Sequence, residues 1–195
     1  PAPSTANTAA LSFANDLGVR YSEGLYKNTF IGRTFIMPGQ EERKKSVKYK
    51  LVPQELEIRD KKVMILDDSI VRGNTSREIV RMLKDFGAKE VYFTVACPPV
   101  KSPCFYGVDM PTKKELIAGN MSEQEIEKYL EVDALLYQTI EDLVEAVTRR
   151  GNHYIDRPCM ACLDGYYVAK DIDNAKITEM EEMRTFDRTS GDSVN

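Results

Sequence analysis

The chain has 195 residues, of which 42% are hydrophobic and 30% charged, a composition typical of one globular domain with a sizeable core. The formal net charge of −4 gives no general attraction for nucleic acid or anionic membranes, so we expect neither partner. No stretch reaches the roughly 18 apolar residues of a membrane span. The first residues also lack the pattern of a signal peptide, which together predicts a cytoplasmic protein.

The first quarter of the chain is predicted to hold one helix and one loop. The helix is capped by Ser4 or Thr5 and ends near Leu17, where Gly18 stops it. The segment 29–50 contains glycine and proline, begins without periodicity and ends in a basic run of helical character. This pattern predicts a mobile lid. The "VP" at residues 52 and 53 then ends the helical run before the next element.

Strands and helices then alternate along the chain. Ser122 and Glu125 form a capping box, Thr139 can cap a later helix, and Gly87 and Gly151 are helix stops. The predicted strands are 61–66, 90–96 and 133–138, and the predicted helices are 75–88, 139–151 and a charged, fraying helix over about the last 25 residues. Such alternation predicts an α/β fold with a mainly parallel sheet, helices on both faces and a site at the carboxyl ends of the strands.

The stretch "VMILDDSIVRGNTS", residues 63–76, has the pattern of a phosphate site. Its apolar run ends in Asp67 and Asp68, and a loop then enters a helix whose first amides, near 74–76, have no intrahelical acceptor and can bind an anion. Gly73 lets the backbone approach, and the hydroxyls of Thr75 and Ser76 can add hydrogen bonds. Two carboxylates beside a phosphate suit sugar hydroxyls or Mg²⁺, so the stretch favours a phosphorylated ribose over a capped turn with two solvated acids.

The cysteines form a second group of candidate ligands. Cys159 and Cys162 have C-x-x-C spacing, and Cys104 follows a proline in "SPCFYG". From spacing alone, an iron–sulfur cluster and a zinc site completed by His153 are equally supported, and a thioredoxin-like pair or three buried thiols remain open. Cys97 is predicted to be a core residue, and His153 is better explained as a surface side chain.

The phosphate stretch resembles the phosphoribosyl pyrophosphate (PRPP) motif of type I phosphoribosyltransferases. Further strings narrow the resemblance to the amidophosphoribosyltransferase family, in its iron–sulfur branch: "GLYKNTFIGRTFIMPGQ", "RKKSVKYKL", "SPCFYGVDMPTKKELIA" and "CMACLDGYYV". The resemblance implies a type I phosphoribosyltransferase fold over residues 1–170, partial because a first strand and the glutaminase domain are expected before Pro1, and a charged helical tail at 171–195. The implied reaction transfers ammonia from glutamine to C1 of PRPP, giving 5-phosphoribosylamine and pyrophosphate in the first step of purine synthesis.

The resemblance also assigns roles to residues. Asp67 and Asp68, with the Thr5 hydroxyl, would hold Mg²⁺, although Ser4 stands where the family has an acid, which predicts weaker metal binding. The residues implied to bind substrate are Lys27, Arg33, Ser69, Ile70, Val71, Arg72, Gly73, Asn74, Thr75 and Ser76, and those implied to hold a [4Fe–4S] cluster, with a fourth ligand outside this chain, are Cys104, Cys159 and Cys162. The phosphate loop is expected to lie apart from these cysteines.

Partners follow from the same resemblance: the glutaminase domain of the same enzyme, purine nucleotides as feedback inhibitors, and further copies in a tetramer. Three alternatives are kept open, namely a non-catalytic nucleotide sensor on the same fold, another type I phosphoribosyltransferase, and a structural iron–sulfur or zinc module.

Overall fold

The computed structural model describes residues 1–28, 51–108, 110, 112–148, 157–169, 172 and 174–191, with the side chains of 174 and 184–191 excluded. The predicted lid, with Arg33, and the predicted stop at Gly151, with His153, lie outside these residues. The described elements are α1 (Asn7–Leu17), β1 (Leu25–Lys27), β2 (Leu51–Pro53), α3 (Glu55–Ile58), β3 (Lys62–Asp67), α4 (Asn74–Asp85), β4 (Glu90–Val95), a 3-10 helix η2 (Lys113–Glu115), α5 (Ile117–Asn120), α6 (Glu123–Leu130), β5 (Ala134–Tyr137), α7 (Ile140–Thr148), α8 (Ala161–Asp164) and α9 (Asn174–Gly191).

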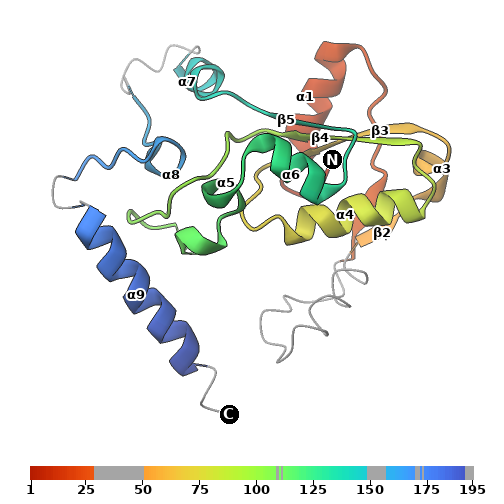
Figure 1. The fold of residues 1–195 in the computed structure, drawn as a ribbon. Coiled ribbons are helices and arrows are strands. Elements are labelled where there is room, and N and C mark those ends of the chain that lie inside the picture. The colour runs from red at the N-terminus through yellow and green to blue at the C-terminus, as the bar shows by residue number, and fades with distance from the viewer. Residues whose placement is uncertain are drawn as a thin grey trace.

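A parallel sheet in the order β3-β4-β5 forms the centre of the molecule. Its register places Asp67 opposite Val95 and Val95 opposite Tyr137, so the carboxyl ends of the three strands lie level with one another. The three predicted strands and their parallel arrangement are therefore confirmed. A separate antiparallel pair, β1 with β2, lies beside this sheet (Figure 1).

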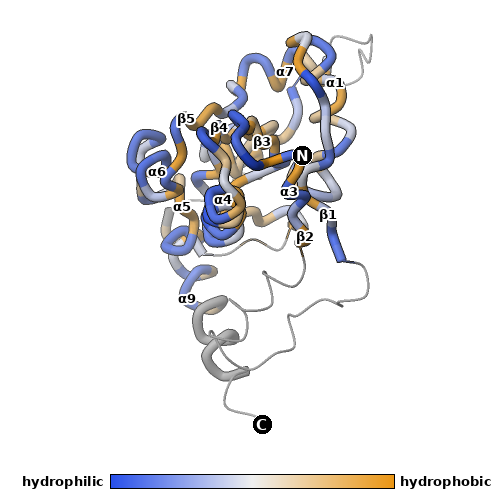
Figure 2. The backbone as a smooth tube through the Cα atoms, turned by 90° about the vertical axis from the view of Figure 1, so that its right-hand side faces the viewer, coloured by the Kyte–Doolittle hydropathy of each residue, from blue (hydrophilic) through white to orange (hydrophobic). Residues whose placement is uncertain are grey.

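Helices cover both faces of the sheet, as predicted. Figure 1 shows α4 and α6 on one side and α1 on the other. On the α4 side, Ile65 and Phe93 pack with Ile79 and Leu83 in the main core. On the α1 side, Leu66 packs with alanines of the first helix in a smaller cluster. Figure 2 shows β3 and β4 largely hydrophobic and α6 largely hydrophilic.

Most predicted helix boundaries are confirmed by hydrogen bonds. Gly18 ends α1 with a φ of 65°. Ser122 and Glu125 form the predicted reciprocal capping box, with the Ser122 N–H donating to Glu125 Oε2 at 2.7 Å. The Asp142 N–H donates to Thr139 Oγ1 at 3.1 Å, which is the predicted cap of α7.

The predicted start of α1 is wrong. The helix begins at Asn7 after Ala6, and no side chain caps it, because Ser4 and Thr5 belong to the preceding turn. Ala6 is 1% exposed and packs in the cluster that contains Leu66. Burial of this small side chain against the sheet therefore fixes where the helix starts, in place of a capping hydroxyl.

The strands β1 and β2 were missed from the sequence. Residues 51–53, where the "VP" was expected to break a helical run, pair with 25–27, and Leu25 lies opposite Pro53. The pair joins the two ends of the segment predicted as a lid. A strand of three residues is too short to show a periodic pattern. These two became recognisable only through their pairing with each other, which the sequence does not reveal.

Beside β3 the structure has a groove of about 420 Å³, lined by parts of α1, β1, α3 and β3. In the part of the chain that is described, β3 is an edge strand of its sheet, and the Ala2 N–H donates to Leu66 O at 2.7 Å at its carboxyl end. The expected first strand, before Pro1, stays a prediction. No described helix is both long and apolar enough to cross a membrane.

Candidate functional site

The two aspartates of the phosphate stretch lie at the carboxyl end of β3. Asp67 is the last residue of the strand and is half-buried, whereas Asp68 is exposed. The Asp68 N–H donates to Asp67 Oδ1 at 2.8 Å, and the Ser69 hydroxyl donates to Asp68 Oδ1 at 3.1 Å. Ser69, predicted to bind substrate, thus orients one of the two acids.

The pKa of Asp67 is raised from 3.8 to about 6, mainly by burial; the N–H from Asp68 opposes the shift and the charge of Asp68 adds to it. A carboxylate that is costly to ionise in the free protein is suited to a cation, because a bound divalent ion offsets both the desolvation and the repulsion. The donor set therefore fits Mg²⁺.

The raised pKa predicts that Asp67→Asn stabilises the ligand-free protein. A carboxyl whose pKa is higher in the folded state destabilises the fold where it is ionised, so the cost is complete above about pH 6 and absent below 3.8. We expect a gain on the order of 1 kcal/mol near pH 8 that shrinks toward pH 4, measured by urea unfolding. Asp85→Asn, an exposed control at the far end of α4, should change stability by only about a few tenths of a kcal/mol. An Asp67→Asn variant no more stable than wild type near pH 8 would contradict the raised pKa.

Gly73 is the hinge between the loop and α4. It has a φ of 77°, and a Cβ built on it would lie 2.6 Å from Ile117 Cδ1, so glycine is required both for conformation and for space. Its carbonyl accepts the Arg77 N–H at 2.9 Å, which closes the first helical turn. Asn74 and Thr75 are exposed at the start of α4, whereas Ser76 is buried, so of the two predicted hydroxyls that of Thr75 is the more accessible.

A segment far along the chain supports the loop. The Ile117 N–H donates to Val71 O at 2.9 Å, and Arg72 Nε donates to Glu115 Oε1 at 3.0 Å. The guanidinium of Arg72, predicted to bind substrate, is therefore paired with η2, and the equally predicted Ile70 is fully buried in the core. Sequence reasoning gave Glu115 and Ile117 no role although both lie in the string "SPCFYGVDMPTKKELIA", because nothing in that string indicates contact with the loop.

The other predicted substrate and metal ligands come from neighbouring segments. Thr5 is exposed in the N-terminal segment that Ala2 anchors at the carboxyl end of β3. Lys27 is exposed at the end of β1, next to the segment predicted as a lid. The structure thus places residues 67–76 in one candidate site, and the substrate and metal roles of all these residues stay predictions.

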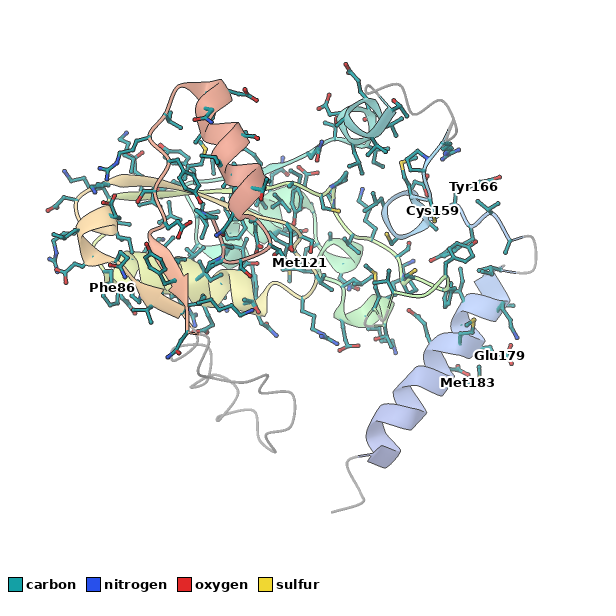
Figure 3. All side chains as sticks on the ribbon, turned by 180° about the vertical axis from the view of Figure 1, so that it is seen from behind. Phe86, Met121, Cys159, Tyr166, Glu179 and Met183 are labelled. Atoms are coloured by element: carbon teal, nitrogen blue, oxygen red, sulfur yellow. The ribbon has the colours of Figure 1, made fainter. Side chains whose placement is uncertain are left out.

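The two cysteine-bearing segments are joined by hydrogen bonds. The N–H groups of Lys101 and Ser102 donate to Cys162 O at 2.9 and 3.0 Å, and the Tyr167 hydroxyl donates to Pro103 O at 2.7 Å. These bonds join the loop after β4, which carries Cys104, to the segment around α8. Figure 3 shows Cys159 and Tyr166 at this same end of the molecule.

The thiols lie close enough to influence one another. Burial raises the pKa of Cys162, and the neighbouring Cys104 and Cys159 thiols raise it further. In the described ranges, no group of three or more His, Cys, Asp or Glu side chains is arranged to hold a single metal ion. Both the iron–sulfur cluster and the zinc site therefore stay predictions.

One expectation about the cysteines is wrong. Val71 of the phosphate loop packs in the same apolar cluster as Cys162 and the buried Met160, so the loop does not lie apart from the cysteine segment. Cys97 also contacts this cluster; it is half-buried, which raises its pKa and agrees with its prediction as a core residue. Two motifs that are distant in the sequence are therefore joined by one set of side chains.

A parallel sheet with two aspartates at a strand end, followed by a glycine-hinged loop and a helix, is the arrangement of the type I phosphoribosyltransferases. Two solved structures share this fold: glutamine PRPP amidotransferase from B. subtilis complexed with ADP and GMP, and the allosteric regulatory enzyme of purine biosynthesis. Their TM-scores are 0.75 and 0.77, each is 38% identical, and the matches cover 90% and 92% of this chain but 39% and 38% of theirs. No protein-family profile matches the chain.

Sequence comparison finds similar proteins that share one name. The chain is 50% identical over 184 residues to the amidophosphoribosyltransferase of Pseudomonas aeruginosa, 43% over 187 residues to that of Escherichia coli, and 44% over 185 residues to that of Saccharomyces cerevisiae. These matches cover 94%, 96% and 94% of the chain but only 36%, 37% and 35% of the relatives. The chain is therefore a homologue of the transferase part of the amidophosphoribosyltransferases, which confirms the resemblance to that family. Its placement in the iron–sulfur branch stays a prediction.

Proposed function

We propose that this chain is the phosphoribosyltransferase half of an amidophosphoribosyltransferase, which transfers the phosphoribosyl group of PRPP to ammonia. The observation that carries the proposal is the placement of Asp67 and Asp68 directly before the Gly73-hinged start of α4, in a chain with half its residues identical to such an enzyme. Calorimetric titration of the full-length protein with PRPP, with and without Mg²⁺, tests it: we expect tight binding only with the metal.

The residues have separate roles in the proposed reaction. The first amides of α4 and the Thr75 hydroxyl bind the 5-phosphate, while Asp67 and Asp68 accept the ribose hydroxyls and hold Mg²⁺. Mg²⁺, when bound, supplies positive charge for the leaving pyrophosphate. As the C1–oxygen bond to pyrophosphate breaks, the ammonia nitrogen bonds to C1 and loses a proton. Positive charge develops on the ribose, as in glycosyl transfer, and carboxylates that bind the ribose hydroxyls would favour it.

Water competes with ammonia for the activated ribose, so the site has to exclude it. The antiparallel pair β1 and β2 holds together the two ends of the segment 28–50, and Lys27 stands at the end of β1. The β1–β2 pair is a suitable anchor for a lid that brings Lys27 and Arg33 toward the pyrophosphate when substrate is bound. The proposal assigns both side chains to the leaving group.

The comparisons favour an amidophosphoribosyltransferase over the three alternatives kept open from the sequence. The matched relatives are named as transferases, and a similar solved structure contains ADP and GMP. We extend the proposal accordingly to a glutaminase domain as the source of ammonia, to purine nucleotides as inhibitors, and to a cytoplasmic, tetrameric enzyme. A sensor would bind nucleotide without consuming PRPP.

We further propose that Cys104, Cys159 and Cys162 hold a [4Fe–4S] cluster with a fourth thiolate from elsewhere in the protein. Support comes from the hydrogen bonds that join the β4 loop to the α8 segment, and from the mutual influence of the three thiols. The cluster would tie these two segments together and act as a structural staple, since soft thiolates are good ligands for iron.

Cys159→Ser should remove the cluster from the anaerobically purified full-length protein. Cys159 is exposed, so the change removes a ligand with little loss of packing. We expect the brown absorption to disappear and bound iron to fall from about four per chain to near zero by elemental analysis. The control Cys97→Ala, at a half-buried cysteine outside the proposed ligand set, should retain iron. Zinc in the wild-type protein, or equal iron in both variants, would refute the cluster.

A further inference from the structure

Tyr129 on α6 contacts the point at which the phosphate loop becomes α4. Its hydroxyl donates to Asn74 Oδ1 at 3.2 Å. Its ring borders Gly73, because a Cβ on that glycine would lie 3.3 Å from Tyr129 Cε1. A single side chain, separated by 55 residues from Asn74, thus contacts both residues of the hinge.

The Tyr129 ring is itself held in place by charged neighbours. Arg77 lies over its face, with Cζ 4.6 Å from the ring centroid, and Arg77 Nη2 donates to Glu131 Oε1 at 2.9 Å. The backbone N–H of Arg77 also donates to Gly73 O. The ring therefore packs against both ends of the first turn of α4, and a guanidinium of this kind on an aromatic face is attractive.

Docking of α6 onto α4 does not need these contacts. Ile126 and Leu130 are fully buried in the main core and supply the apolar anchors of α6. Tyr129 is only half-buried, and its polar contacts all point at the start of α4. The contacts of Tyr129 therefore hold the start of α4 in place, in addition to the packing of the two helices.

We propose that Tyr129 is a positioning residue for the phosphate loop, which fixes Gly73 and Asn74 so that the first amides of α4 converge on the ribose 5-phosphate. The inference rests on the proposed function. Amides that are already oriented need no reorganisation when the phosphate arrives, and a loop that is correctly oriented for only a fraction of the time binds more weakly by that fraction. The tyrosine touches the loop and not the ligand.

The test uses full-length protein with three variants and two partial ligands. Tyr129→Phe removes only the hydroxyl, Tyr129→Leu also removes the ring, and Tyr92→Phe is a control, because the Tyr92 hydroxyl bonds to Glu90, away from the loop. Ribose 5-phosphate probes the loop, and pyrophosphate with Mg²⁺ probes the rest of the site. We expect the affinity for ribose 5-phosphate to fall about threefold in the Phe variant and about tenfold in the Leu variant.

The affinity for pyrophosphate with Mg²⁺ should stay unchanged in every variant, and hydrogen exchange at the Arg77 amide should accelerate in Tyr129→Leu. If that variant fails to fold, Tyr129→Phe still decides the question, because it keeps the ring. Lower stability with unchanged affinity for ribose 5-phosphate would show a purely structural tyrosine and overturn the inference. A wild-type protein that binds neither PRPP nor ribose 5-phosphate would overturn the proposed function, and the positioning role with it.

Discussion

Gly73→Ala should abolish measurable PRPP binding and destabilise the protein by on the order of 2 kcal/mol. Two causes add here, since the backbone at this position has a φ of 77°, which strains any residue with a Cβ, and the new methyl group would lie 2.6 Å from Ile117 Cδ1. The end of the Ile117 side chain can rotate away, but relief of the backbone strain shifts the loop, and the amides that face the phosphate move with it. Binding is measured by calorimetry and stability by urea unfolding.

Gly18→Ala separates these two causes. Gly18 has a φ of 65°, but an added Cβ there meets nothing within 4 Å. We expect this control to lose about 1 kcal/mol of stability from backbone strain alone and to bind PRPP normally. Equal destabilisation of the two variants, with PRPP affinity retained in Gly73→Ala, would show that the hinge is not part of the site.

Asp67→Asn and Asp68→Asn should each lower the rate of pyrophosphate release by about 100-fold or more at moderate Mg²⁺ concentration. Each change removes a full negative charge beside the proposed cation while nearly keeping the shape of the side chain. Added Mg²⁺ should recover part of the loss, because the defect lies in metal affinity. Asp85→Asn, an acid at the other end of α4, should keep normal activity.

For Asp67 the two expected effects have opposite signs: the same substitution stabilises the free protein and impairs function. This combination is diagnostic of a binding carboxylate whose ionisation is unfavourable until its cation arrives. Wild-type Mg²⁺ dependence in a folded Asp67→Asn variant would refute a metal role for this residue.

The sequence predicted those parts of the fold whose signals are local. The apolar runs of β3, β4 and β5, the stop at Gly18 and the capping box at Ser122 each depend on neighbours within a few residues, and the structure confirms them. The strands β1 and β2 were missed because only pairing across the intervening segment makes them strands. The start of α1 was missed because contact of Ala6 with the sheet outweighs a capping hydroxyl.

The candidate site divides in the same way. The carboxylates, the glycine hinge and the first amides of α4 lie in one continuous stretch, so their chemistry could be recognised from the order of residues. Glu115 and Tyr129, which support that stretch, lie 43 and 55 residues from the loop residues that they contact. Only the folded structure brings these two residues to the loop. Nothing about their positions in the sequence indicates that they support it.

The most direct test of the proposed function is pyrophosphate release from PRPP by the purified full-length protein, with ammonium chloride in place of glutamine. We expect release that requires both Mg²⁺ and ammonia and that yields one phosphoribosylamine for each pyrophosphate. A folded protein that releases no pyrophosphate, or that releases it at the same rate without ammonia, would contradict the assignment of this chain as the transferase half.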